Sequence, residues 1–200
     1  VHDEAAVAQM RFAGAVSVAA HLAGMRATQP GAGEQAPYAA MVDVFRRHGC
    51  DDAYPPIVTV HGEVLHQHAH DGATADGDLM LADVGGESPE GWAADITRTW
   101  PVSGTYSGSQ RAIYDVVLEA QRRAIAAVTP GRRYRDVHET AKRALVEGLV
   151  DLGILRGDVD GLLERGAAAL FFPHGVGHII GLDVHDMEDL GARAGYASGR

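Results

Sequence analysis

The same order of elements is predicted twice along the chain. Apolar residues recur at helical spacing over residues 4–25, Pro30-Gly31 ends that helix, and a second helix follows over residues 38–47. The β-branched run at 57–60 then predicts a strand. A second pair of helices, divided by Pro130-Gly131, begins about 100 residues later, and a strand is expected after it. This repetition favours an α/β (α+β) fold of two related helix-helix-strand halves.

Three signals describe the second pair of helices. Ser107 followed by Gln110 has the spacing of a capping box, so the third helix should begin there. Gly153 is suited to end the fourth helix, since glycine readily adopts the left-handed conformation found after a helix. The apolar residues of the third helix are predicted to lie on one face, and they are Ile113, Val117, Ala120, Ala124 and Ala127.

Composition limits the class of protein. The chain is long enough for one sizeable core and has no low-complexity linker, so residues 1–200 are expected to form a single domain. With 17 Lys and Arg against 27 Asp and Glu, the formal charge of −10 disfavours nucleic-acid and anionic-membrane partners. Cys50 is the only cysteine, and no apolar run reaches the ~20 residues of a membrane span. A cytoplasmic location is therefore expected.

Two aspartates are placed by a predicted hairpin. Residues 79–84 and 92–100 are predicted strands, joined by a turn at 85–91. If the hairpin folds symmetrically about Pro89, Asp83 lies opposite Asp95 with about 5 Å between the Cβ atoms. Two carboxylates so close repel each other unless a proton or a cation lies between them. A bridging metal ion is one hypothesis, and two turn-proximal acids that face water are the alternative.

Three histidines form a second cluster, in the run FFPHGVGHIIGLDVHD. They are His174, His178 and His185, and the glycines around them argue against a continuous helix with the two-histidine zinc motif. Imidazoles gathered this closely indicate a metal or catalytic site. The alternatives are a glycine-rich turn with incidental histidines and, with less support, a dinucleotide loop at residues 175–177.

A third group of histidines precedes the first aspartate. In a strand, His66, His68 and His70 would share one face, which permits a separate metal site. Asp71-Gly72 follows directly, so a solvated stretch is the alternative.

Three blocks of the sequence resemble the signatures of one enzyme family. LMLADVGG with Asp83, AADITRTWPVSG with Asp95, and the FFPHGVGHIIGLDVHD block resemble those of M24-type metallopeptidases, which include Xaa-Pro aminopeptidase and Xaa-Pro dipeptidase (prolidase). The likeness extends over residues 4–190. It implies the pita-bread fold, in which two pseudo-symmetric halves surround a curved antiparallel sheet.

The resemblance also implies metal ligands and a reaction. Asp83 would ligate one ion, Asp95 would bridge two ions, and His178 would be the histidine ligand. Such a set suits two divalent ions, Mn²⁺ first, with Co²⁺ or Zn²⁺ as alternatives. The implied reaction is hydrolysis of the bond between an N-terminal residue and proline in short Xaa-Pro peptides, by a hydroxide that bridges the metal ions.

Further histidines would handle the substrate. His66, seventeen residues before Asp83, matches the family histidine that helps bind substrate and stabilise the reaction centre. His174 and His185 match the two histidines that line the substrate pocket. The family's habit implies a homodimer.

The chain departs from the family pattern in three respects. The interval from Asp83 to Asp95 is twelve residues, one longer than usual. The family's two glutamate ligands are not found before Arg200, so they are expected on a segment beyond residue 200. The family's amino-terminal domain is also absent, and a catalytic-domain fragment is therefore expected. Three other functions stay open: a binding module of the same fold, a creatinase-like hydrolase that is not a peptidase, and a methionine aminopeptidase.

Overall fold

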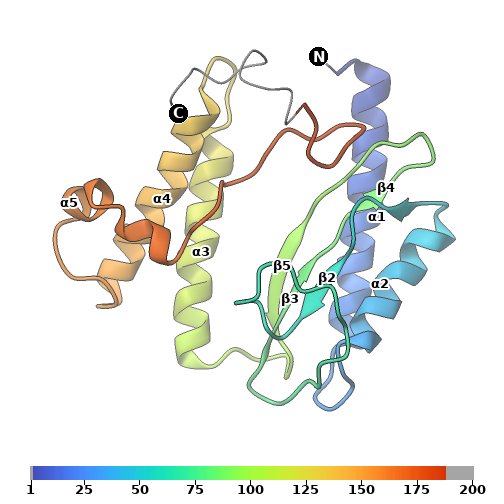
Figure 1. The fold of residues 1–200 in the computed structure, drawn as a ribbon, viewed down its shortest axis with the longest axis horizontal. Coiled ribbons are helices and arrows are strands. Elements are labelled where there is room, and N and C mark those ends of the chain that lie inside the picture. The colour runs from blue at the N-terminus through green and yellow to red at the C-terminus, as the bar shows by residue number, and fades with distance from the viewer. Residues whose placement is uncertain (1, 188–200) are drawn as a thin grey trace. The chain divides into compact units, whose positions relative to one another are not determined.

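The computed structural model describes residues 2–187 of the chain, whose elements are labelled in Figure 1. Of these, residues 2–105 and 179–187 form one compact unit, and residues 106–178 form a second. A long helix pair occurs in each unit, which confirms the predicted repetition of helices.

The first unit is a helix pair packed on a small antiparallel sheet. Helices α1 and α2 lie side by side (Figure 1), and the three-stranded sheet has the order β2-β3-β5. Strand β1 pairs separately with β4. The elements are α1 (Glu4–Ala27), α2 (Gln35–Arg47), β1 (Asp51–Asp52), β2 (Ile57–Thr59), β3 (Leu79–Asp83), β4 (Gly86–Glu87) and β5 (Thr97–Pro101).

One apolar core joins this sheet to both helices. Phe45 and Met41 of α2 and Met80 of β3 are fully buried, and each large side chain removed from water contributes about 1.5–3 kcal/mol. The indole of Trp100 in β5 donates a hydrogen bond to Thr28 Oγ1 over 3.0 Å, at the end of α1. The sheet that contains β3 and Asp83 is therefore held against α1 and α2 by packing and, through β5, by a buried polar contact.

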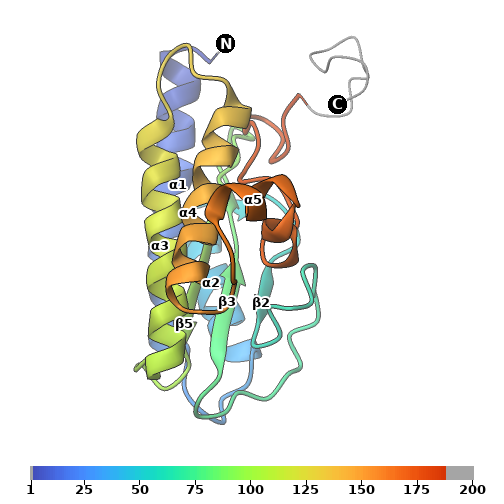
Figure 2. The same cartoon turned by 90° about the vertical axis from the view of Figure 1, so that its left-hand side faces the viewer.

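The second unit is built on another helix pair. Helices α3 and α4 run side by side, as Figure 2 shows, and two short helices follow. The predicted capping box is confirmed, because Gln110 N donates to Ser107 Oγ over 3.3 Å and Ser107 N donates to Gln110 Oε1 over 2.9 Å. The elements are α3 (Gly108–Ala127), α4 (Tyr134–Asp151), α5 (Val159–Glu164) and the 3₁₀ helix η1 (Ala167–Leu170).

The strand expected in this unit is missing from the described residues, and the predicted apolar face of α3 is only partly buried. Ile113 and Val117 are 39% and 52% exposed, and the buried positions of α3 are Ala120 and Ala124, the second of which packs with Val137 and Ala141 of α4. Up to residue 187, no strand follows α4. Instead the Asp158 carboxylate accepts a hydrogen bond from Gly161 N over 2.7 Å and caps α5, so a local cap starts a helix where a strand was expected.

The described part of the chain contains only part of the architecture implied by the resemblance. Its sheets have three strands and two strands, and the larger curved sheet is not among the elements of residues 2–187. Within the same residues, no helix is both long and apolar enough to span a membrane.

We predict that Gly85→Ala destabilises the chain by about 3 kcal/mol or more, the upper range for an overpacked site. A Cβ at this position would overlap the carbonyl oxygen of Ala94 and lie 2.9 Å from the ring of Tyr54. The change is checked by the free energy of unfolding in urea.

Gly14→Ala is the matched control for this prediction. Gly14 lies inside α1 with no atom within 4 Å of the added Cβ, so the change should stabilise the chain by about 0.5–1 kcal/mol. Equal unfolding free energies for the two variants would show that the hairpin tolerates a side chain at Gly85.

Candidate metal centre

The predicted hairpin is present, but its strands pair in a different register. Asp83 of β3 lies opposite Thr97 of β5, so the hairpin is centred on Glu90 rather than on Pro89. The prediction that Asp83 lies directly opposite Asp95 is therefore wrong.

The turn explains this register. Ser88 N donates to Trp92 O over 2.8 Å, and Gly91 N donates to Ser88 O over 2.8 Å. Gly91 has a φ of 83°, a backbone conformation that glycine adopts without strain. The closed loop is thus built around Glu90, one residue later than the symmetric turn that the sequence suggested.

The two carboxylates nevertheless lie on the same face of the hairpin. The observed and predicted pairings differ by two residues, and side chains alternate between faces with a period of two. Asp95 lies two residues before Thr97, the partner of Asp83, and the ladder continues as Val84 N donates to Ile96 O over 3.1 Å. The central expectation from sequence, two neighbouring carboxylates, therefore holds in a diagonal rather than a direct arrangement.

Tyr54 joins the two carboxylates. Its hydroxyl oxygen lies 2.7 Å from Asp83 Oδ1 and 2.9 Å from Asp95 Oδ1. Tyr54 precedes β2, and Ile57 of β2 pairs with Asp83, so the antiparallel pairing brings the tyrosine to the end of β3 that carries the aspartate. Tyr54 was not among the residues predicted from sequence. The signal that could have found it is the pairing of the strand at 57–60 with the strand at 79–84.

Burial and mutual repulsion shape the electrostatics of this pair. Burial raises the pKa of Asp83 above its ordinary value, and the charge of Asp95 adds to this, while hydrogen bonds from Tyr54 and Thr97 act in the opposite direction. Burial, followed by the charges of Asp83 and Asp95, raises the pKa of Tyr54 far above its ordinary value. The Tyr54 hydroxyl therefore keeps its proton and serves as a donor to the carboxylates.

The donor set fits a divalent cation in part. Two half-buried carboxylates on one face are the oxygen ligands that hard and borderline divalent ions prefer. Among residues 2–187, however, no group of three or more His, Cys, Asp or Glu side chains is placed to hold a metal ion. His178, half-buried, is the last residue of the second unit, whereas both aspartates belong to the first. The first unit thus supplies two of the three predicted ligands.

The segment after His178 contacts the hairpin close to Asp95. Ala93 N donates to Gly181 O over 2.9 Å, and Asp186 N donates to Ile179 O over 3.0 Å, which closes the segment into a turn. His185 lies in this turn with an exposed side chain. Two of the blocks singled out from sequence, the one with Asp95 and the end of the one with His185, therefore meet within the first unit.

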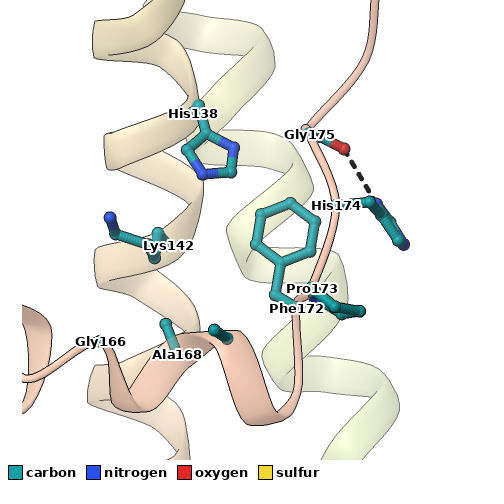
Figure 3. A pocket seen from close by; sticks show the side chains of 9 residues that line it. His138, Lys142, Gly166, Ala168, Phe172, Pro173, His174 and Gly175 are labelled. Atoms are coloured by element: carbon teal, nitrogen blue, oxygen red, sulfur yellow. Dashed lines mark hydrogen bonds between the residues drawn. The ribbon is translucent and has the colours of Figure 1, made fainter. Parts of the chain in front are cut away.

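His174 borders an open cavity of about 390 Å³ in the second unit. Figure 3 shows His174 beside Phe172, with His138 and Lys142 of α4 across the cavity. The Nδ1–H of His174 donates to Gly175 O over 3.0 Å, since a carbonyl oxygen only accepts. In the neutral ring Nε2 is then the acceptor, so the exposed imidazole is suited to bind a polar group of a ligand.

The histidines before Asp83 do not share one strand face. No strand is present between β2 and β3, and His66 and His68 are exposed, whereas His70 is buried. The His70 ring stacks on Tyr38 with 4.0 Å between ring centroids, and its Nδ1 lies 3.3 Å from Val58 O. The separate metal site considered for these residues is therefore not formed, because packing and a backbone contact draw His70 into the core.

Comparison with known proteins identifies the family. The sequence matches metallopeptidase family M24 over residues 8–199, and the chain belongs to this family. The Xaa-Pro aminopeptidase of Haemophilus influenzae is 41% identical over 185 residues, which cover 91% of this chain and 43% of that protein. A probable Xaa-Pro aminopeptidase of Talaromyces stipitatus is 40% identical over an alignment of 206 residues, gaps included, which covers 98% of this chain and 43% of that protein.

Solved structures agree with this assignment. Pseudomonas aeruginosa aminopeptidase PepP superposes with a TM-score of 0.90 at 41% identity, covering 92% of this chain and 42% of that chain. An Escherichia coli aminopeptidase P variant in complex with substrate gives a TM-score of 0.91 at 39% identity, covering 96% and 44%. The α/β architecture of these enzymes is thus shown for this chain, which spans less than half of their length.

We predict that Tyr54→Phe lowers the stability of the metal-free chain by about 1–3 kcal/mol at neutral pH, because the half-buried carboxylates of Asp83 and Asp95 lose a shared donor. Urea unfolding measures the loss. Tyr38→Phe also removes a tyrosine hydroxyl but keeps the stack on His70, so it should change stability by less than about 0.5 kcal/mol. Equal losses in both variants would show that the hydroxyl of Tyr54 has no special role.

Proposed function

We propose that the protein containing this chain is a metal-dependent Xaa-Pro peptidase, which hydrolyses the bond between an N-terminal residue and proline. The observation that carries this proposal is the pair Asp83 and Asp95, two half-buried carboxylates that share the Tyr54 hydroxyl on one face of a hairpin. Such a pair is costly without a cation, so a function in metal binding explains why it is there. The names of the relatives support the choice of substrate.

The metal site would be completed from several segments. Asp83, Asp95 and His178 would hold two divalent ions, most favourably Mn²⁺, with Co²⁺ and Zn²⁺ as alternatives. The two glutamates of the family pattern are proposed to lie on a segment beyond residue 200. When bound, the metal ions would lower the pKa of a water molecule and polarise the scissile carbonyl.

The other residues of the proposed site orient the carboxylates and bind the peptide. Tyr54 donates to the carboxylates and holds their oxygens on one face. The exposed imidazoles of His66, His174 and His185 are proposed to contact the peptide, and a donor aimed at the developing negative charge contributes about 3–4 kcal/mol in comparable sites. The remaining elements of the proposal are a homodimer and a cytoplasmic location.

The first test is hydrolysis of an Xaa-Pro dipeptide and of an Xaa-Pro-Yaa tripeptide, with and without Mn²⁺. Because the chain spans 43% of its Haemophilus relative, the experiment uses the longest natural polypeptide that contains it. Metal-dependent cleavage is expected, and the preferred peptide separates a dipeptidase from an aminopeptidase. A metal-free, inactive polypeptide would instead favour a binding module of the same fold.

Asp95→Asn should lower kcat/KM by about 1,000-fold or more and reduce the bound metal, since a bridging carboxylate is lost. Asp76→Asn is the matched control, because Asp76 is exposed in the loop before β3 and should leave kcat/KM unchanged within about twofold. Metal content is measured together with activity for both variants. Full activity of Asp95→Asn would exclude the proposed metal centre.

His185→Ala should separate turnover from metal binding. We expect kcat to fall by about 100-fold or more while the metal content stays at the wild-type level, because His185 is assigned to the substrate and not to the metal. Equal losses of turnover and metal would contradict this assignment.

A further inference from the structure

Glu34 is a buried carboxylate outside the proposed metal centre. It lies at the start of α2 in the first unit and is 2% exposed. Its Oε1 accepts hydrogen bonds from Thr59 Oγ1 and from Val60 N, each over 2.8 Å. Its Oε2 accepts a third from Gly72 N over 3.1 Å. The carboxylate therefore joins the start of α2 to two other parts of the chain, residues 59–60 and Gly72.

Burying the Glu34 carboxylate is costly, which indicates that the hydrogen bonds its two oxygens accept are important for the structure. A carboxylate removed from water is unfavourable unless strong hydrogen bonds replace its hydration, and these three donors are neutral. A packed apolar side chain would fill the same space at lower cost. What it could not do is accept from Val60 N and Gly72 N at once.

These two donors lie at the ends of one loop. Val60 directly follows β2, and Gly72 lies on the return path toward β3. A second bond supports the return end, because Glu34 N donates to Gly72 O over 3.0 Å. A Cβ on Gly72 would lie 2.6 Å from Glu34 Cδ, so this position is closely fitted to the carboxylate. Glu34 thus closes residues 61–71 into a loop with anchored ends.

The loop carries His66, whose exposed side chain gains little fixation from packing. Its place relative to the sheet depends on the two ends of the loop and on His70, which is buried against Tyr38 and Val58 four residues later. We propose that Glu34 is a positioning residue, which holds this loop so that His66 meets the substrate. The inference rests on the proposed peptidase function, but the anchoring of the loop can be measured without it.

A double-mutant cycle tests the proposal in the full-length, metal-loaded protein. Glu34→Gln keeps the shape of the side chain but replaces one acceptor oxygen by a donor, and it should lower kcat/KM by about 10-fold or more with metal content unchanged. On the His66→Ala background the same change should cost less than about twofold, because a positioning residue has nothing left to position. Glu164→Gln, at an exposed glutamate that ends α5, is the control and should have no effect.

Thr59→Val is a milder second variant. It removes one of the three donors to Glu34, together with the acceptor of His61 N, and leaves the two backbone donors to the carboxylate, so it should fold even if Glu34→Gln does not. Its loss of kcat/KM should be smaller and should again vanish on the His66→Ala background. Losses that stay the same on that background, for whichever variants fold, would overturn the proposal, and so would a His66→Ala protein with wild-type activity.

Amide hydrogen exchange supplies a readout that does not depend on peptidase activity. In Glu34→Gln, and to a lesser degree in Thr59→Val, segments that contain Val60 and Gly72 should exchange faster, with α3 and α4 unchanged. If the wild-type protein cleaves no Xaa-Pro peptide, the proposed function fails and hydrogen exchange alone decides whether Glu34 anchors the loop. Unchanged exchange in both variants would overturn the anchoring itself.

Discussion

The close approach of Asp83 and Asp95 is the constraint around which the first unit is organised. Two like charges on one face of a hairpin are unfavourable, and partial burial makes the repulsion stronger than it would be in water. The surrounding structure answers this in two ways. The core of α1, α2 and the three-stranded sheet fixes the backbone of the hairpin, and Tyr54 supplies a donor to the carboxylate pair. The rest of the unit thus stabilises a pair of carboxylates that is unfavourable by itself, as is common at functional sites.

Local rules predicted much of this arrangement. The helix pairs, the capping box at Ser107 and the hairpin all follow from signals within a few residues of one another. The prediction for Asp83 and Asp95 tolerated an error in register because the difference was an even number of residues. A shift by one residue would have placed the carboxylates on opposite faces of the hairpin. The prediction that they share a face therefore requires only that the register shift is an even number of residues.

Long-range contacts could not be predicted in the same way. Tyr54 reaches Asp83 only because β2 pairs with β3, and nothing near Tyr54 in sequence marks it as part of a site. Glu34 gives no signal either, since a glutamate at the start of a helix is ordinarily a surface residue. The apolar pattern of α3 did not say which of its residues are buried: Ile113 and Val117 have the helical period, but the buried positions are Ala120 and Ala124. The spacing of the apolar residues predicts the helix, but which of its residues are buried depends on the element that packs against it.

The Tyr54 hydroxyl also limits what can neutralise the pair. It has one proton, yet it lies within hydrogen-bond distance of an oxygen on each of two carboxylates. One proton cannot form a full hydrogen bond to both oxygens at once, so Tyr54 orients the pair without neutralising it. Burial and the neighbouring charge already raise the pKa of Asp83, which shows that a further positive charge would be stabilised at this position. A shared proton would meet this need with a single charge. A divalent cation would supply two positive charges to the same two carboxylates. The arrangement therefore leaves the carboxylate pair in need of a cation, which supports the proposed metal centre, and the family to which the chain belongs is one of metallopeptidases.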